Sequence, residues 1–169
     1  MMESEEKESL VQKIFLRLKT DSAFRAALKR VDNPATEYKS WEYLADFGVN
    51  LENKNERLLY TTIFAAIAKS GRETDGNLEF GKALCAAYDW DKESAPARSK
   101  LRRVIACGDL AELCAVLRSI LQFISSKNVP ICYQKLLDDL RFFGDGEKVK
   151  SKWAAQFYSN GESIDGEEK

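Results

Sequence analysis

The sequence predicts an all-α fold, arranged as a two-lobed bundle of about nine helices. Apolar residues recur at helical spacing in nearly every segment, and no segment of useful length alternates apolar and polar side chains as a half-buried strand would. Glycines and small polar residues, the usual ends and starts of helices, divide this pattern into blocks. The 169 residues are 44% hydrophobic, enough to fill one sizeable core or two small lobes that share an interface.

Five helices are predicted in the first half of the chain. Asn33 and Pro34 are typical of the N-cap and first position of a helix, and Gly48 and Gly71 each follow an apolar run that they would end. The longest of these helices carries one apolar face, made of Leu59, Ile63, Phe64 and Ile67. The predicted helices span residues 8–19, 22–31, 35–47, 52–70 and 77–88.

Four more helices are predicted in the second half. Asp109 followed by Glu112 forms a capping-box pattern, and Gly108, Gly144 and Gly161 each follow an apolar run. The helix after Asp109 has a continuous apolar face, made of Leu110, Leu113, Leu117, Ile120, Leu121 and Ile124. We expect this helix and the one over residues 52–70 to be the central helices of the two lobes. The predicted helices span residues 95–107, 110–126, 132–143 and 146–159.

The balance of basic and acidic residues differs between the two halves of the chain, although the net charge is only −1. Residues 10–93 hold 13 basic and 13 acidic side chains, whereas residues 94–160 hold 11 basic and 6 acidic ones. We therefore predict an N-terminal helical lobe, a basic C-terminal helical lobe joined to it by the polar loop DWDKESAP, and two mobile acidic tails. The boundaries are residues 10–90 and 94–160 for the lobes, and residues 1–9 and 161–169 for the tails.

The residue types present argue against an enzyme and against a metal or cofactor site. The chain has no histidine, and its four cysteines lack the C-x-x-C spacing of zinc and redox motifs, so we expect them to be small buried hydrophobes. The pairs Asp138–Asp139 and Asp89–Asp91 lack the clustering that a Mg²⁺ site needs. With no signal peptide and no run long enough to span a bilayer, a cytoplasmic protein without membrane contact is expected.

Positive charge is concentrated between Ser94 and Leu110, where four of the six positions 98–103 are cationic: Arg98, Lys100, Arg102 and Arg103. On a helix the apolar residues cluster on one side and these cations spread over the other, without the acidic residues at i±4 that solvated faces usually interleave. Arginine suits phosphate oxygens, so the helix is either an ordinary solvated face or a contact for nucleic acid or another polyanion.

Other cations add to this surface. Lys148 and Lys152 lie four residues apart, beside an apolar stripe of Val149, Trp153 and Phe157 that we interpret as core. The remaining candidates are Lys29, Arg30, Arg118 and Arg141. Such a surface suits a phosphate backbone rather than a base sequence, because no base-reading motif is present.

The order of segments resembles the CasB family, the small subunit of the type I-E CRISPR surveillance complex Cascade. The resemblance runs from about Leu18 to Tyr158, and it is carried by order and spacing rather than by any single segment. The segments are AALKRVDNP, WEYLADFG, LLYTTIFAAIA, NLEFGKAL, KLRRVI, LAELCAVLRSIL, LLDDLRFFG and VKSKWAAQFY. The chain departs from the family pattern at Ser119, Cys132 and Phe143.

The resemblance implies a non-enzymatic helical subunit that sits as a pair with a second copy of itself, beside the backbone and large subunits of Cascade. It implies a basic surface that holds the displaced single-stranded DNA and supports the guide RNA. The matching basic positions are Lys29, Arg30, Lys82, Arg102, Arg103 and Arg118. Three alternatives stay open: a helical module that docks an acidic protein, an RNA-binding protein working alone, and, least favoured, a metal-dependent nuclease using Asp138 and Asp139.

Overall fold

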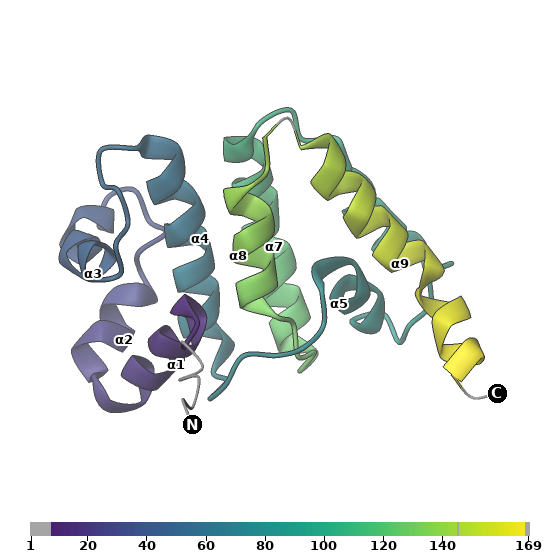
Figure 1. Cartoon of the computed structure of the whole chain (residues 1–169), viewed down its shortest axis with the longest axis horizontal. Coiled ribbons are helices and arrows are strands. Elements are labelled where there is room, and N and C mark those ends of the chain that lie inside the picture. The colour runs from purple at the N-terminus through teal and green to yellow at the C-terminus, as the bar shows by residue number, and fades with distance from the viewer. Residues whose placement is uncertain (1–7, 145, 168–169) are drawn as a thin grey trace, which may run out of the picture.

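The computed structural model describes residues 8–144 and 146–167, with side chains to residue 159, and this part of the chain is all-α as predicted. It contains nine α-helices, one 3-10 helix and no sheet; a single isolated bridge pairs Leu78 with Ile131 (Figure 1). The helices are α1 (Leu10–Thr20), α2 (Ser22–Leu28), η1 (Glu37–Ser40), α3 (Trp41–Asp46), α4 (Lys54–Ser70), α5 (Phe80–Ala86), α6 (Ala95–Ile105), α7 (Leu110–Ser126), α8 (Tyr133–Arg141) and α9 (Glu147–Glu167).

Two boundaries differ from the prediction. Asn33 does not cap a helix: its carbonyl accepts from the N–H groups of both Thr36 and Glu37, so tight turns and then η1 precede α3. At the other end α9 continues through Gly161 to Glu167. Glycine costs a helix about 1 kcal/mol relative to alanine but clashes with nothing, so it need not end one.

Local caps define the helices that carry the predicted basic residues. Ser94 accepts a hydrogen bond from the Ala97 N–H and starts α6, with proline in its first turn. Asp109 accepts from the Glu112 N–H at 2.8 Å, and Glu112 accepts in return from the Gly108 N–H at 2.7 Å. The predicted capping pair at the start of α7 is therefore present, with its return bond one residue earlier than in the usual motif.

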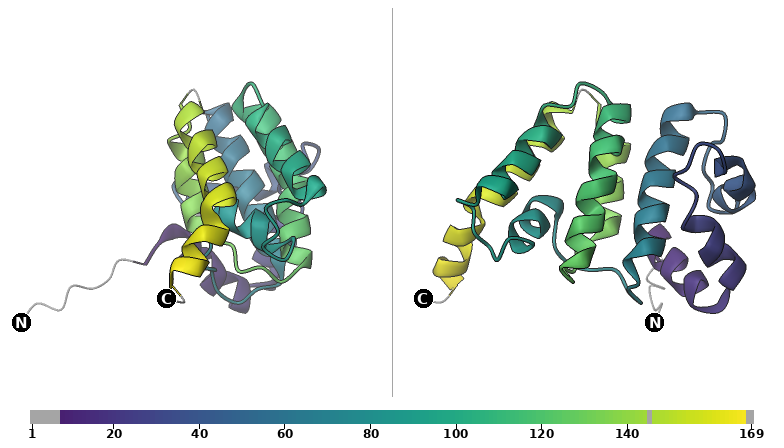
Figure 2. Two further views of the ribbon diagram at one scale, coloured as in Figure 1. Left: turned by 90° about the vertical axis from the view of Figure 1, so that its right-hand side faces the viewer. Right: turned by 180° about the vertical axis from the view of Figure 1, so that it is seen from behind.

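The helices pack in an order that does not follow the sequence. α4 lies at the centre of one group, with α1 and α2 on one side and α7 and α8 on the other; α5 packs against α9 and α6 in a second group (Figures 1 and 2). Packing thus crosses the predicted junction in both directions, through α4 with α7 and through α5 with α9. One continuous set of buried side chains joins the two groups. The division into lobes at residues 90–94 stays a prediction.

The cysteines are free and buried, as predicted, and burial raises the pKa of all four thiols. Among the described residues, no helix combines the length and apolarity needed to cross a membrane. For the acidic tails, residues 1–7 and 168–169 lie outside the described residues.

Candidate nucleic-acid interface

The buried side of helix α6 determines which of its basic residues face solvent. Ala97, Leu101 and Val104 are fully buried, which turns the opposite side of the helix toward solvent. Arg102 and Arg103 lie on that side, are exposed, and form no ion pair with any described residue. We call these two residues the α6 ridge. Their charges are available to an anion without breaking a contact within the protein.

The other two predicted cations of α6 are engaged within the protein. Arg98 is half-buried: it pairs with Glu93 at 3.0 Å, donates from Nε to the Lys92 carbonyl at 2.7 Å, and lies 5.6 Å from the centre of the Tyr158 ring. Lys100 donates to the Tyr88 hydroxyl, and its Nζ lies 4.7 Å from the centre of the Phe123 ring. These residues fasten α6 to its neighbours, so only half of the predicted cluster faces solvent freely.

A second basic surface lies where α2, α4 and α7 meet. A hollow of about 680 Å³ is lined by Lys29 at the C-cap of α2, Lys69 from α4 and Arg118 from α7. Asp32 also lines it and pairs with Lys69 at 3.0 Å. Lys29 also lines an adjoining hollow of about 480 Å³. We call the two hollows together the basic groove; its cations are Lys19, Arg25, Lys29, Lys69, Arg72 and Arg118, and its acids are Asp32 and Glu73.

Two arginines of the basic groove have incompletely satisfied donors. The Nε atoms of Arg72 and Arg118 are buried and have no hydrogen-bond acceptor among the described residues. Leaving a buried donor unpaired costs about 1–3 kcal/mol, so such groups are uncommon in folded proteins. These Nε atoms are out of reach of solvent, so the unpaired donors do not by themselves mark an anion site.

Helix α7 lies between the two basic surfaces. It packs against α6 on one side and α4 on the other, and the three helices follow one another across the face seen from behind in Figure 2. After Glu112 the helix carries no acidic residue, and its exposed positions hold small or uncharged side chains: Ala115, Ser119, Gln122 and Ser126. A polyanion that crosses α7 from the α6 ridge to the groove therefore meets no carboxylate on this helix.

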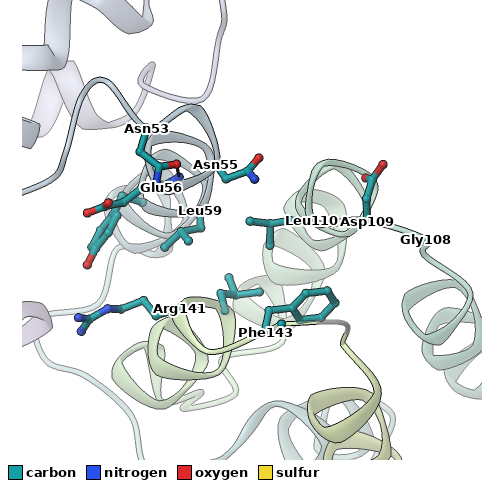
Figure 3. Close-up of a pocket in the computed structure, with 12 residues that line it drawn as sticks. Asn53, Asn55, Glu56, Leu59, Gly108, Asp109, Leu110, Arg141 and Phe143 are labelled. Carbon is teal, nitrogen blue, oxygen red and sulfur yellow. Dashed lines mark hydrogen bonds between the residues drawn. The ribbon is translucent and has the colours of Figure 1, made fainter.

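The structure does not bring the remaining predicted residues into these surfaces. Arg30 and Lys148 are exposed and Lys82 is half-buried, and none of them forms an ion pair with a described residue. Lys152 pairs with Asp139. Arg141 lines a separate pocket of about 550 Å³ at the ends of α4, α7 and α8, which also contains Glu56 and Asp109 (Figure 3). Because two acids oppose one arginine, that pocket does not favour an anion.

Four cations of the basic groove were missed in the sequence: Lys19, Arg25, Lys69 and Arg72. They come from α1, α2, α4 and the segment after α4, so no window of the sequence shows them as a cluster. One signal was present, because Lys69 and Arg72 flank Gly71, which ends α4 in a left-handed conformation. Cations near a helix C-terminus are common, however, since they complement the helix dipole.

The pair Asp138–Asp139, considered as a metal or catalytic site, has other partners. Asp139 pairs with Lys152 and accepts from the Trp153 indole N–H at 2.9 Å, while Asp138 accepts from the Gln134 amide at 3.1 Å. Within the described residues, no group of three or more acidic or cysteine side chains is arranged to hold a metal ion.

Comparison with known proteins gives one match. A family model described as CRISPR-associated protein Cse2 matches residues 24–158, which is most of the chain. The matched span begins in α2 and ends in α9, so it includes both the α6 ridge and most of the basic groove. No curated protein and no solved structure gives a significant match.

Proposed function

This chain belongs to the Cse2 family, the small subunits, also called CasB, of the type I-E CRISPR complex Cascade, and we propose that it holds displaced single-stranded DNA. In this proposal the subunit is non-catalytic and works in the cytoplasm, within a complex that includes the backbone and large subunits, a second copy of the chain and the guide RNA. The displaced strand follows the α6 ridge, crosses α7 and enters the basic groove.

The observation that carries this proposal is the position of the two basic surfaces on either side of α7, which carries no acidic residue after Glu112. Arg102 and Arg103 have no ion-pair partner among the described residues, and Arg118 reaches the groove from α7 itself. Single-stranded nucleic acid is held chiefly by positive charge along its backbone, with or without base stacking. The arrangement supports recognition of phosphates rather than of sequence.

Weak binding is sufficient for this role. Opening a duplex to pair one strand with a guide RNA is a nearly balanced exchange, so a modest affinity for the displaced strand shifts the equilibrium. The balance is known for a different RNA-guided effector, and it applies to Cascade by physical analogy. The function requires positive charge at a fixed position and no chemical step.

The test is the salt dependence of binding to an oligothymidine, measured by fluorescence anisotropy. Each phosphate contact on a single strand contributes about −0.7 to the slope of log K against log salt. We expect Arg102→Gln with Arg103→Gln to make the wild-type slope shallower by about 1.4 if each arginine meets one phosphate. A second variant, Lys29→Gln with Lys69→Gln, tests the groove in the same way.

The matched control is Lys13→Gln with Lys39→Gln, which removes the same charge from exposed positions outside both surfaces. A slope change in the control as large as that in the ridge variant would mean that only net charge matters, and would contradict the proposal. If no variant or wild-type protein binds DNA at low salt, while the ridge variant fails to join the other Cascade subunits, the basic face serves a protein partner instead.

A further inference from the structure

Two large aromatic side chains lie exposed where η1 meets α3. Tyr38 of η1 is 59% exposed, and Trp41, the first residue of α3, is 36% exposed. The Trp41 N–H donates to the Tyr38 carbonyl, as in a 3-10 turn, so the two side chains lie on the same side of the segment. Lys39 between them is turned about 120° away. We call Tyr38 and Trp41 the aromatic platform.

Trp41 is held in place by an arginine of α4. The guanidinium carbon of Arg57 lies 5.1 Å from the centre of the Trp41 ring. Arg57 is itself fixed from two directions, because its Nη1 donates to the Leu51 carbonyl and its Nε lies 3.7 Å from a Glu37 carboxylate oxygen. The Tyr38 side chain forms no hydrogen bond or ring contact with a described residue. The platform therefore combines one ring of fixed position with one that is free to meet a ligand.

The aromatic platform adjoins the basic groove. A hollow of about 170 Å³ crosses α4 between them, and it is lined by Arg118 from α7, Arg57 from α4 and Glu37 from η1. Arg118 and Asp32 also line the basic groove, so the hollow continues the groove. Figure 1 shows α3 on the opposite side of α4 from α7. A strand that leaves the groove past Arg118 therefore reaches the platform by crossing α4.

The charge of this hollow suits a polyanion. Its three cations and two acids are Lys54, Arg57, Arg118, Asp32 and Glu37. Both acids already form ion pairs, Asp32 with Lys69 and Glu37 with Arg57. Lys54 and Arg118 have no carboxylate partner among the described residues. A positively charged channel with exposed aromatic rings is the arrangement that holds single-stranded nucleic acid, because phosphates follow the charge and bases stack on the rings.

We propose that bases of the displaced strand stack on the aromatic platform where the strand leaves the basic groove. This inference rests on the proposed function, and it adds base contacts to the phosphate contacts. Stacking tolerates any sequence, because every base has a π-face. It also requires an open base face, which a duplex does not present. The platform thus gives the basic surface a preference for single strands over duplex DNA.

The test separates bases from phosphates by comparing two probes in fluorescence anisotropy. One is oligothymidine, and the other is an oligonucleotide of equal length whose sugars carry no bases. We expect the wild type to bind oligothymidine about 5- to 10-fold more tightly, a ratio that stacking of one base on an aromatic side chain can supply. The salt slopes for the two probes should be equal, because both present the same phosphates.

The platform variant, Tyr38→Leu with Trp41→Leu, should bind both probes equally and keep the wild-type salt slope, since it changes no charge. The matched control is Trp90→Leu with Phe142→Leu, which removes two exposed aromatic rings that line neither the basic groove nor the hollow beside it. The control should keep the preference for oligothymidine. Circular dichroism checks that both variants are folded.

A second measurement leaves the platform intact. In a Trp90→Phe protein, Trp41 is the one exposed tryptophan, because Trp153 is fully buried. A base stacked on Trp41 quenches its fluorescence. We expect saturating oligothymidine to quench the emission and the probe without bases to leave it nearly unchanged. Equal emission with both probes would count against stacking even if the platform variant did not fold.

The outcomes separate this inference from the proposed function. Equal affinity of the wild type for both probes, with a negative salt slope, would overturn stacking and leave the proposed function standing. If neither probe binds at low salt, both fail. Tryptophan, tyrosine and arginine are also enriched at protein interfaces. A platform variant that binds both probes as the wild type does, but no longer joins the other Cascade subunits, would show a protein contact and overturn stacking.

Discussion

Arg98 differs from the other arginines of α6 because its guanidinium contacts three groups of the protein. The contacts are with the Glu93 carboxylate, the Lys92 carbonyl and the Tyr158 ring. We expect Arg98→Ala to lower the free energy of unfolding by about 1–2 kcal/mol and to leave the salt slope of DNA binding unchanged. Arg102→Ala should leave the free energy of unfolding nearly unchanged and make the salt slope of DNA binding shallower. Urea unfolding and anisotropy on both variants check this, and a loss of slope in Arg98→Ala without loss of stability would refute the assignment.

Asp139 is held by hydrogen bonds from two side chains of α9. Its side chain is only 11% exposed, and its two oxygens bond to Lys152 and to the Trp153 indole. Asp139→Asn should cost about 1–3 kcal/mol of stability, whereas Asp138→Asn, at a half-exposed position, should cost about 0.5 kcal/mol or less. Thermal unfolding measures both. Nucleotide release by the wild type with Mg²⁺, abolished in a folded Asp139→Asn protein, would instead establish a nuclease.

Tyr133 should make the free energy of unfolding fall at alkaline pH. It is fully buried, its hydroxyl has no hydrogen-bond partner among the described residues, and burial raises its pKa to about 12. The folded pKa lies above the unfolded value of about 10, so the stabilisation is complete below pH 10 and is lost between pH 10 and 12. At pH 11 ionisation of the unfolded chain should cost the wild type about 1.4 kcal/mol that Tyr133→Phe does not lose.

The measurement for Tyr133 is urea unfolding of both proteins at pH 8 and pH 11. The buried cysteines also lose protons in this range, but they are common to both proteins and cancel in the difference. We expect the free energy of unfolding of Tyr133→Phe to equal or exceed that of the wild type at pH 8, because the variant lacks an unpaired buried hydroxyl. At pH 11 we expect the difference in favour of the variant to be larger. A constant difference between the two pH values would show that Tyr133 does not titrate on unfolding.

At the scale of elements, α5 and α9 meet through a glycine. A Cβ at Gly81 would lie 2.2 Å from the Trp153 carbonyl oxygen and 2.6 Å from the Gln156 Cβ, and the Gly81 N–H donates to the Gln156 amide oxygen at 2.9 Å. Gly81→Ala should therefore cost about 2–3 kcal/mol, because the helices must separate. Gly108→Ala is the control, since its nearest contact would be an ordinary 3.5 Å. Chemical denaturation that finds the two variants equally stable would contradict this close approach.

Sequence predicted the elements well because their causes are local. The periodicity of apolar residues and the caps at Ser94 and Asp109 act within a few positions, so the spans of α6 and α7 agree closely with expectation. The packing of α5 on α9 is different, because it depends on Gly81 meeting Trp153 from a distant part of the chain. Only one consequence of that pairing was visible beforehand, namely that Trp153 belongs to the core, which the structure confirms.

The same distinction applies to the candidate interface. Exposure of Arg102 and Arg103 follows from the helical period alone, and the structure agrees. The engagement of Lys100 could not be predicted, because its partners Tyr88 and Phe123 come from other segments. The basic groove is likewise assembled from distant segments, so Lys29 and Arg118 were recognised as basic positions while their meeting with Lys69 was not.

At the scale of the whole molecule, the crossed packing predicts that neither half folds alone. In residues 94–160, α7 and α8 would lose the apolar face of α4, and α9 would lose α5; in residues 10–90, α4 and α5 would be left uncovered in turn. Each Å² of apolar surface that loses its cover costs about 25 cal/mol. Uncovering a few helices therefore costs more than the roughly 5–15 kcal/mol by which a typical domain is stable. We expect each fragment to lack a cooperative thermal transition by circular dichroism, and an equimolar mixture to regain one. A fragment of residues 94–160 that unfolds cooperatively by itself would show that the basic half is an independent lobe, as the charge distribution first predicted.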